Sequence, residues 1–250
     1  MVTRTENLAC SCQLIKRPPS GKERKIAVII PTLNEEGGIG LVLDHVRKAM
    51  QHYNHHILVV DGHSTDDTLN IAKKKGASTL FQPGMGYGDA LRAGFNHACQ
   101  CMGADIIVMA DADGTYDPYD VPALVNPILT NESDVVIGNR FDRMDGGAMP
   151  FINRVGNRVL SLIARILLGI HVSDTQCGLR SMRADLVRKV NIESDGMPFA
   201  TEMLAKFKKA GARISESPVS YHARHGESKM RPFVDGFAIL RRILAEAEFL

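Results

Sequence analysis

Two carboxylates stand one residue apart at the end of an apolar segment. Residues 106–110 (IIVMA) are apolar and run directly into Asp111-Ala112-Asp113-Gly114. The apolar run favours a buried strand of a parallel sheet, and open α/β sheets bind their ligands at the carboxyl ends of such strands. Paired carboxylates there suit Mg²⁺ or Mn²⁺, which would normally hold a diphosphate as well. On spacing alone, an acidic loop with an Asp-Gly turn is an equally good interpretation.

Cationic residues are expected at the same edge of the sheet. Residues 134–139 are predicted to form another strand, with Arg140 just past its end, where a guanidinium could bind a phosphate through two hydrogen bonds. A salt bridge to a surface carboxylate is the alternative. A basic loop, residues 222–231, follows a segment that Pro218 marks as an edge strand. Its cations could close over a bound diphosphate, or the loop could simply be solvated.

The segments that would position these residues alternate in a regular way. Residues 25–30, apart from Lys25, and residues 57–60 are apolar, and each run ends at polar residues, the turn 31–36 (PTLNEE) in the first case and Asp61 in the second. A helical pattern follows each turn. Strand, acidic turn and helix then recur at Asp111. This alternation predicts a doubly wound α/β fold with a mostly parallel central sheet flanked by helices, in a single domain.

A glycine-rich loop, residues 84–88, precedes another predicted helix. Glycines allow a backbone to approach a ligand closely, but a flexible turn before a core helix explains the loop equally well. The spacing differs from the Gly-x-Gly-x-x-Gly fingerprint of dinucleotide sites, so the loop predicts no nicotinamide cofactor.

Length and composition favour a soluble protein with one core. The 250 residues are 44% hydrophobic and 23% charged, with a net charge of +2, which argues against a protein that coats nucleic acid. No apolar run reaches the roughly 18 to 20 residues that cross a bilayer, and the N-terminus lacks the apolar centre of a signal peptide. No zinc-finger spacing involves the five cysteines. We interpret them as reduced thiols, which predicts a cytoplasmic protein.

Three regions are expected along the chain. Residues 1–24 are predicted to be a flexible N-terminal arm, residues 25–232 the α/β domain, and residues 233–250 a C-terminal amphipathic helix. Within the domain, residues 151–168 combine helical apolar spacing with interleaved arginines. Such a helix can lie at a membrane surface, although core packing with solvated arginines explains the pattern nearly as well.

Seven motifs taken together resemble family 2 glycosyltransferases of the GT-A fold. The closer resemblance is to the polyprenyl-phosphate sugar synthases, the group of dolichol-phosphate mannose and glucose synthases, and it covers residues 25 to about 232. The motifs that carry it are Pro31-Thr-Leu-Asn34-Glu35-Glu36, Asp61-Gly-His-Ser64-Thr-Asp66, Gly86-Tyr-Gly88 with Arg92-Ala-Gly94, Asp111-Ala-Asp113, Gly138-Asn-Arg140, Asp174-Thr-Gln-Cys-Gly178-Leu-Arg180 and Gly226-Glu-Ser228-Lys229.

The resemblance implies a role for each matching residue. The nucleotide pocket would be lined by Pro31, Thr32, Asn34 and Glu36, with Asp61 at the base or ribose. Asp111 and Asp113, with Ala112 between them, would carry Mg²⁺ or Mn²⁺ and the donor diphosphate. The acceptor phosphate and the leaving diphosphate would be held by Arg140, Arg224, Ser228 and Lys229.

The implied reaction is the inverting transfer of a sugar from a nucleotide-sugar donor to a polyprenyl or dolichyl phosphate. A lipid phosphate is already an anion, so no strong general base is required. The leading alternative is a family 2 enzyme that acts on a sugar hydroxyl or another soluble acceptor, with Asp174 or Glu202 as the base. A nucleotidyltransferase and a non-catalytic nucleotide-sugar sensor are further alternatives. The acidic turn 31–36 argues against the first, and the retained basic loop argues against the second.

Two departures from the family pattern affect these expectations. Thr115 stands where many mannose synthases have glutamine, which favours the branch that uses UDP-sugars and leaves the donor open between UDP- and GDP-linked sugars. Many relatives also continue into C-terminal transmembrane helices, whereas the sequence stops at Leu250. We therefore expect peripheral contact with the cytoplasmic face of a membrane, and no nucleic acid partner.

Overall fold

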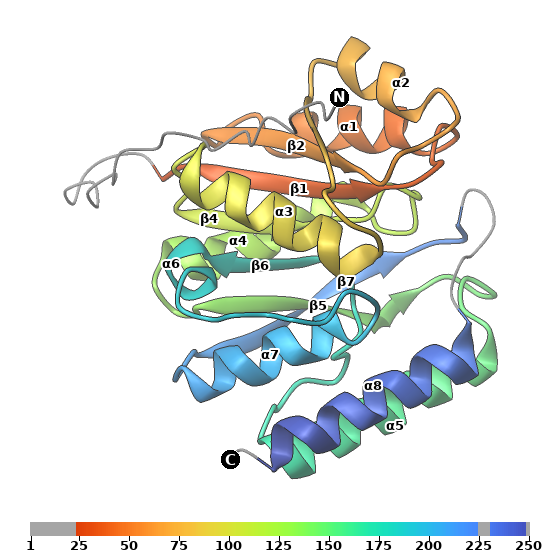
Figure 1. Cartoon of the computed structure of the whole chain (residues 1–250), viewed down its shortest axis with the longest axis vertical. Coiled ribbons are helices and arrows are strands. Elements are labelled where there is room, and N and C mark those ends of the chain that lie inside the picture. The colour runs from red at the N-terminus through yellow and green to blue at the C-terminus, as the bar shows by residue number, and fades with distance from the viewer. Residues whose placement is uncertain (1–23, 225–230, 249–250) are drawn as a thin grey trace, which may run out of the picture.

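A seven-stranded sheet lies at the centre of the computed structural model, which describes residues 24–224 and 231–248 (Figure 1). The strand order is β3-β2-β1-β4-β6-β5-β7, and every strand runs parallel to the others except β6. The strands are β1 (Ile26–Thr32), β2 (His55–Asp61), β3 (Ser78–Phe81), β4 (Ile106–Met109), β5 (Val135–Met144), β6 (Arg180–Arg183) and β7 (Ile214–Tyr221). The prediction of an α/β fold with a mostly parallel sheet is confirmed.

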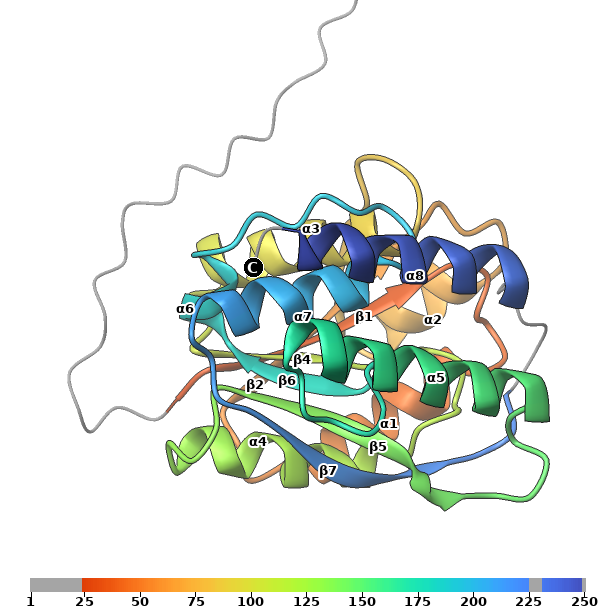
Figure 2. The same ribbon diagram turned by 90° about the horizontal axis from the view of Figure 1, so that it is seen from below.

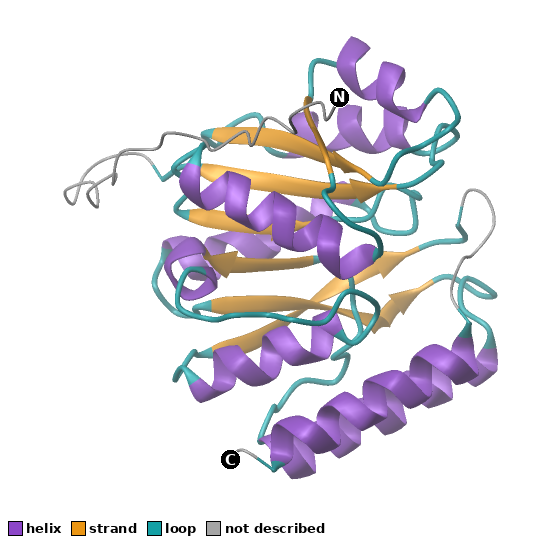
Figure 3. Cartoon of the chain, in the orientation of Figure 1, coloured by secondary structure: helices purple, strands orange, loops and turns teal. Residues whose placement is uncertain are grey.

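Helices cover both faces of this sheet (Figures 1 and 3). They are α1 (Ile39–Ala49), α2 (Thr68–Lys74), α3 (Tyr87–Gln100), α4 (Val121–Leu129), α5 (Phe151–Leu168), α6 (Ala184–Val187), α7 (Phe199–Lys209) and α8 (Pro232–Ala247), with a short 3₁₀ turn, η1 (Pro118–Asp120), before α4. Helices α3 and α7 lie on one face and α1 and α4 on the other (Figure 2). Helix α8 packs on α7, and α5 packs on α8.

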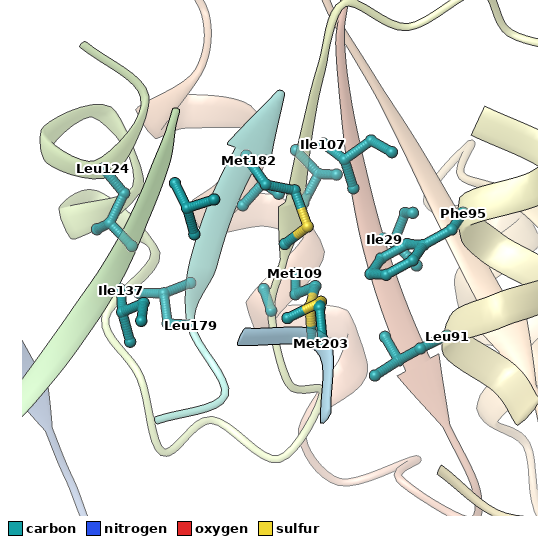
Figure 4. Packing of buried hydrophobic residues seen from close by; sticks show 14 of the residues in the cluster. Ile29, Leu91, Phe95, Ile107, Met109, Leu124, Ile137, Leu179, Met182 and Met203 are labelled. Atoms are coloured by element: carbon teal, nitrogen blue, oxygen red, sulfur yellow. The ribbon is translucent and has the colours of Figure 1, made fainter. Parts of the chain in front are cut away.

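The core forms because the central strands are apolar on both faces. All five residues from Ile26 to Ile30 are buried, as are all four residues of β4, which is the pattern of strands covered on both sides. Figure 4 shows Leu91 and Phe95 of α3 lying against Ile29 of β1. Gly94 allows this approach, because a Cβ at that position would lie 2.6 Å from the Cγ2 atom of Ile29.

The sequence located most elements, with two notable differences. Strand β3 was not predicted, because its four residues are only partly buried or exposed and show no apolar run. Strand β5 extends to Met144, so Arg140 lies within the strand and not past its end. The strand continues because β5 pairs with β7 on both sides of an irregularity between Asn139 and Arg143. The predicted edge strand is confirmed, since β7 is the last strand of the sheet.

Both amphipathic helices are present. Helix α5 has the predicted bounds. Helix α8 begins at Pro232, one residue before the predicted helix 233–250, and ends at Ala247, three residues before its predicted end. Most of the predicted N-terminal arm, and Ser228 and Lys229 of the predicted closing loop, lie outside the described residues. Among the helices that are described, none combines the length and the apolar character that a bilayer span requires.

Candidate active site

A pocket of about 510 Å³ opens at the carboxyl ends of β1 and β4. Its walls come from the turn after β1, the start of α3, residues 111, 112, 115 and 116 after β4, strand β5, the loop 176–180, and the first turns of α5. Ile239 of α8 closes one side. These segments are far apart in the sequence, and the parallel sheet brings them together because parallel strands end at the same edge.

Asp111 lines this pocket. Its Oδ1 atom accepts a hydrogen bond of 3.2 Å from the hydroxyl of Tyr87, and burial together with the neighbouring Asp113 raises the pKa of its carboxyl to about 7. Gly178 leaves the room that the carboxylate occupies, since a Cβ there would overlap with Oδ2. Desolvation and the charge of Asp113 therefore oppose the ionisation of Asp111, and they outweigh the nearby Arg140 and Arg224.

Asp113 is held at both of its carboxylate oxygens. Oδ1 accepts hydrogen bonds from the backbone N–H (3.0 Å) and the hydroxyl (2.7 Å) of Thr115. Oδ2 accepts from Nη1 of Arg224 at 2.9 Å, and Nη2 of the same guanidinium is paired with Glu35. Arg224 therefore bridges the turn after β1 and the turn after β4. Gly38 allows these two turns to approach each other closely, because a Cβ at position 38 would lie 2.5 Å from the carbonyl oxygen of Ala112.

The two acids fit a divalent cation. Among the described residues no three His, Cys, Asp or Glu side chains form a metal-binding group, so within that part of the chain the candidate ligands are the two carboxylates of Asp111 and Asp113. This number is typical of Mg²⁺ sites in which phosphate oxygens and water complete the coordination. The raised pKa of Asp111 supports the fit, because a cation beside the pair would favour the ionised form.

Arg140 lines the pocket, but its guanidinium is engaged by a carboxylate. Nε and Nη2 donate to the two oxygens of Asp174 at 2.6 and 2.8 Å, and both side chains are buried. The guanidinium also lies 5.3 Å from the centre of the Tyr221 ring. Burial opposes the charge of Arg140, but Tyr116 and Asp174 outweigh it and raise the pKa. The salt-bridge interpretation of Arg140 thus describes its contacts, although the pair is buried and not at the surface.

Neither candidate base is placed to accept a proton in the pocket. Asp174 is 1% exposed and paired with Arg140. Glu202 is fully buried beneath α8, where it accepts hydrogen bonds from the backbone N–H groups of Glu193 and Ser194 and pairs with Lys206. Burial raises the pKa of Glu202, but these hydrogen bonds outweigh it and bring the pKa to about 2. Neither acid lines the pocket.

The predicted nucleotide-binding residues separate into two groups. Pro31, Thr32 and Ala112 line the pocket. The others, Asn34, Glu36 and Asp61, are not part of its lining, and the structure instead shows them bonded to the turn between β2 and α2.

These three residues hold that turn in a defined shape. Oδ1 of Asn34, which has a φ of 53°, accepts from the backbone N–H of Thr65 at 2.8 Å. Oε2 of Glu36 accepts from the N–H of Asp67 at 3.0 Å. The carboxylate of Asp61 is fully buried and accepts from the hydroxyl and the N–H of Ser64. Their contacts fix two neighbouring loops at the edge of the sheet.

Some pocket residues were not singled out from the sequence. Tyr87 donates a hydrogen bond to Asp111, and Glu35 is joined to Asp113 through Arg224. Both residues stand within the motifs described above. Arg180 is fully buried and donates to the carbonyl oxygens of Thr175, Cys177 and Ala200. It therefore fixes the loop that carries Gly178. No residue pattern indicated this role, because the partners are backbone atoms.

A family model confirms the resemblance that the motifs suggested. The model for glycosyl transferase family 2 matches residues 27–190. The chain belongs to glycosyl transferase family 2. It is therefore a glycosyltransferase.

Curated relatives share about a third of their residues with this chain. A dolichyl-phosphate hexose transferase of Haloferax volcanii is 35% identical, over 88% of this chain and 92% of the relative. An undecaprenyl-phosphate mannosyltransferase of Micrococcus luteus is 34% identical, over 86% and 91%. A low-salt glycan biosynthesis hexosyltransferase of H. volcanii is 35% identical over 89% of this chain, which spans 54% of that longer relative.

The fold also matches solved glycosyltransferase structures. Glucosyl-3-phosphoglycerate synthase from Mycobacterium tuberculosis, crystallised with Mn²⁺, UDP-glucose and phosphoglyceric acid, has a TM-score of 0.74 and 25% identity, over 90% of this chain and 80% of that one. The similarity confirms the predicted GT-A fold. The ligands named there belong to that enzyme.

Proposed function

We propose that this glycosyltransferase moves a sugar from a UDP- or GDP-linked donor to a polyprenyl or dolichyl phosphate, with inversion at the anomeric carbon. The observation that carries the proposal is the state of the acids around the pocket. Asp111 lines a cavity of about 510 Å³ and Asp113 lies two residues further along the same turn, whereas Asp174 and Glu202 are both bound in buried ion pairs. An acceptor that is already an anion needs no base, so a phosphate acceptor fits this arrangement better than a hydroxyl.

Asp111 and Asp113 would hold Mg²⁺ or Mn²⁺ at the donor diphosphate. The cation supplies positive charge where negative charge grows as the sugar–diphosphate bond breaks. On the protein side, Pro31, Thr32 and Ala112 form the wall against which the nucleotide would lie. Arg224, which already bridges Asp113 and Glu35, would turn towards the diphosphate when the donor enters. Ser228 and Lys229 are proposed to assist it.

The acceptor phosphate would bind on the side of the pocket that holds Arg140. This guanidinium keeps its orientation through Asp174, so its charge is positioned before the acceptor arrives. Apolar groups from Met149, Pro150 and Ile239 lie in the same pocket, where they could contact the first isoprene unit. The names of two relatives support this acceptor class, because both act on polyprenyl phosphates.

A lipid acceptor requires that the enzyme reach a membrane. We propose peripheral contact at the cytoplasmic face, where nucleotide-sugars are available. No nucleic acid partner is proposed, since the net charge is only +2.

A label-transfer assay tests the proposal. Radiolabelled UDP-glucose, UDP-N-acetylglucosamine and GDP-mannose would each be incubated with the enzyme and Mn²⁺ or Mg²⁺, with and without a polyprenyl phosphate. We expect label in the organic phase only when lipid is present, and no label with Asp113→Asn. Glu132→Gln, at an exposed acid distant from the pocket, is the control. Donor hydrolysis without labelled lipid, in every combination, would refute the acceptor.

A soluble acceptor is the second candidate. It is favoured by the structural similarity to an enzyme whose crystals contain phosphoglyceric acid. In that case label would move to a water-soluble product, and a base other than Asp174 and Glu202 would have to take the acceptor proton.

A further inference from the structure

Helices α5 and α8 expose large apolar side chains that the described chain does not cover. On α5, six of them fall within a stripe about 100° wide at 3.6 residues per turn: Phe151, Ile152, Val155, Val159, Leu162 and Ile166. On α8 the exposed apolar residues are Phe233, Val234, Phe237 and Leu244. The exposure is high, at 81% for Phe151, 71% for Ile166 and 70% for Phe237.

Each of these helices is attached to the rest of the protein through a different face from the one that carries the exposed apolar residues. Helix α5 buries Leu160, Ser161, Ala164 and Leu168, two of which are small, whereas all of the six residues in its exposed stripe are large apolar residues. Helix α8 is attached to α7 partly through charge, since Arg242 pairs with the buried Glu202, and Lys209 pairs with Glu246 at 3.0 Å. Both helices thus turn bulky apolar groups outwards, and contiguous apolar surface of this kind marks an interaction site.

Positive charge borders the apolar stripe of α5. The helix contains three arginines, Arg154, Arg158 and Arg165, and no acid. Their spacing of four and seven residues places them on one flank of the stripe. The N-cap residue of α8, Arg231, and Arg241 within the helix are both exposed. The acids of this segment are Asp235 in the first turn, the buried Glu246, and the C-cap residue Glu248. Arginine beside exposed aromatic and aliphatic groups is the composition of a helix that lies in an anionic lipid interface.

The surface is continuous with the active-site pocket. Figures 1 and 2 show α5 and α8 side by side, with their N-terminal ends together at the edge of the sheet where β5 and β7 end. Pro150, Asn153 and Asn157, at the start of α5, and Ile239 of α8 line the pocket. A molecule that lies along the exposed stripes would therefore reach the pocket near Arg140 without crossing the body of the protein.

We propose that the outer faces of α5 and α8 form one docking surface for a bilayer with anionic headgroups, and that the acceptor enters the pocket from this surface. The identity of the acceptor rests on the proposed function, but the docking surface does not. Membrane binding removes the exposed side chains from water, and the flanking arginines pair with headgroup phosphates. The helices lie in the interface and the sheet stays outside it.

Vesicle co-sedimentation tests the surface without requiring activity. The vesicles would contain phosphatidylcholine alone or phosphatidylcholine with an equal amount of phosphatidylglycerol. We expect the wild type to bind the anionic vesicles, and less so at high salt because the arginines contribute. The double variant Ile166→Asp/Phe237→Asp should bind at least about tenfold more weakly. Leu41→Asp, at a 51% exposed position on α1, should bind like the wild type.

Further variants keep the interpretation clear. Ile166→Ser/Phe237→Ser repeats the test without added charge, and circular dichroism checks that each variant folds. Arg165→Gln/Arg241→Gln should lose the preference for anionic vesicles and keep the remaining binding. Unchanged binding in both Ile166/Phe237 variants, or no vesicle binding by the wild type, would overturn the proposal. The proposal would also be overturned if the wild type were a dimer, these variants were monomers, and neither the wild type nor the variants bound vesicles. A second copy of the chain would then be what covers this face.

A transfer assay separates this proposal from the proposed reaction. With a short, water-soluble isoprenyl phosphate, Ile166→Asp/Phe237→Asp should transfer sugar at the wild-type rate, and with acceptor embedded in vesicles it should be at least about tenfold slower. Equal loss with both acceptors would overturn the docking role. If the wild type binds vesicles through this face but labels no isoprenyl phosphate, the acceptor assignment fails and the surface stands.

Discussion

Asp111→Asn is expected to stabilise the protein, and to do so more as pH rises. The cause is the pKa of Asp111, which burial and Asp113 raise from 3.8 to about 7. In the unfolded chain the carboxyl ionises near pH 4, whereas in the folded chain it keeps its proton until about pH 7. The folded state binds more protons between these values, so the free energy of unfolding falls as pH rises from about 4 to about 7.

The size of the effect follows from the same shift. A difference of about three pKa units, at about 1.4 kcal/mol each, corresponds to at most about 4 kcal/mol of lost stability at pH 8. An asparagine carries no charge and still offers Oδ1 to the hydroxyl of Tyr87, so it removes this penalty. The variant and the wild type should have similar stability near pH 4, and their difference should grow up to about pH 7 and then remain constant.

Urea denaturation in the presence of EDTA would measure this difference at pH 4.5, 6 and 8, with the free energy of unfolding extrapolated to zero urea. Asp44→Asn is a suitable control, because Asp44 forms an exposed pair with Lys75 and such pairs contribute little. A stability difference that does not depend on pH, or that shrinks as pH rises, would refute the assignment of Asp111 as a buried acid with a raised pKa.

Three further changes probe the surroundings of the two acids. Asp174→Ala leaves the buried guanidinium of Arg140 without its partner, and should lower the free energy of unfolding by about 3–5 kcal/mol in the same urea assay; a loss below about 1 kcal/mol would contradict the buried pair. Gly178→Ala places a methyl group against Asp111 and should weaken Mn²⁺ binding, followed by electron paramagnetic resonance, by about tenfold or more while the fold is kept. Arg224→Gln should lower kcat more than it changes the KM for the donor, because its charge acts on the leaving diphosphate; a change in KM alone would contradict this role.

The fold was largely predictable because its central strands are apolar runs that end in polar residues. Strands β1, β2 and β4 each have this form, and the right-handed βαβ rule leaves few ways to assemble them. Strand β3 was not predicted because it is an edge strand of the sheet and has no apolar run. The end of β5 was misplaced for a related reason. Its last four residues include the exposed Asp142 and Arg143 and show no apolar run, and their pairing with β7 keeps them in a strand.

The site was predictable in its residue types but not in its pairings. Asp111 and Asp113 could be found because they follow a buried strand, and the neighbouring position of β1 and β4 then brings Glu35 to the same edge of the sheet. Whether Arg140 is held by a carboxylate depends on Asp174, which lies 34 residues away on a loop with no periodic pattern. The same holds for Glu202, whose partners come from the preceding loop and from α8. Charge pairing across such distances is set by the finished fold, so a sequence motif cannot separate a base from a structural anion.

Arg224 shows why this distinction matters for the reaction. Its guanidinium neutralises Asp113 and Glu35 together, and Asp113 has no other described side-chain cation within ion-pair distance. If the same Asp113 oxygen is to ligate a cation, Arg224 must leave it, and the donor diphosphate offers the nearest replacement anion. Donor binding and the release of Arg224 would then be one event, because each charge exchanges one partner for another. Arg224 would reach the leaving diphosphate only when a donor is bound. Asp113 and Glu35 would therefore be without their arginine partner only while the reaction takes place.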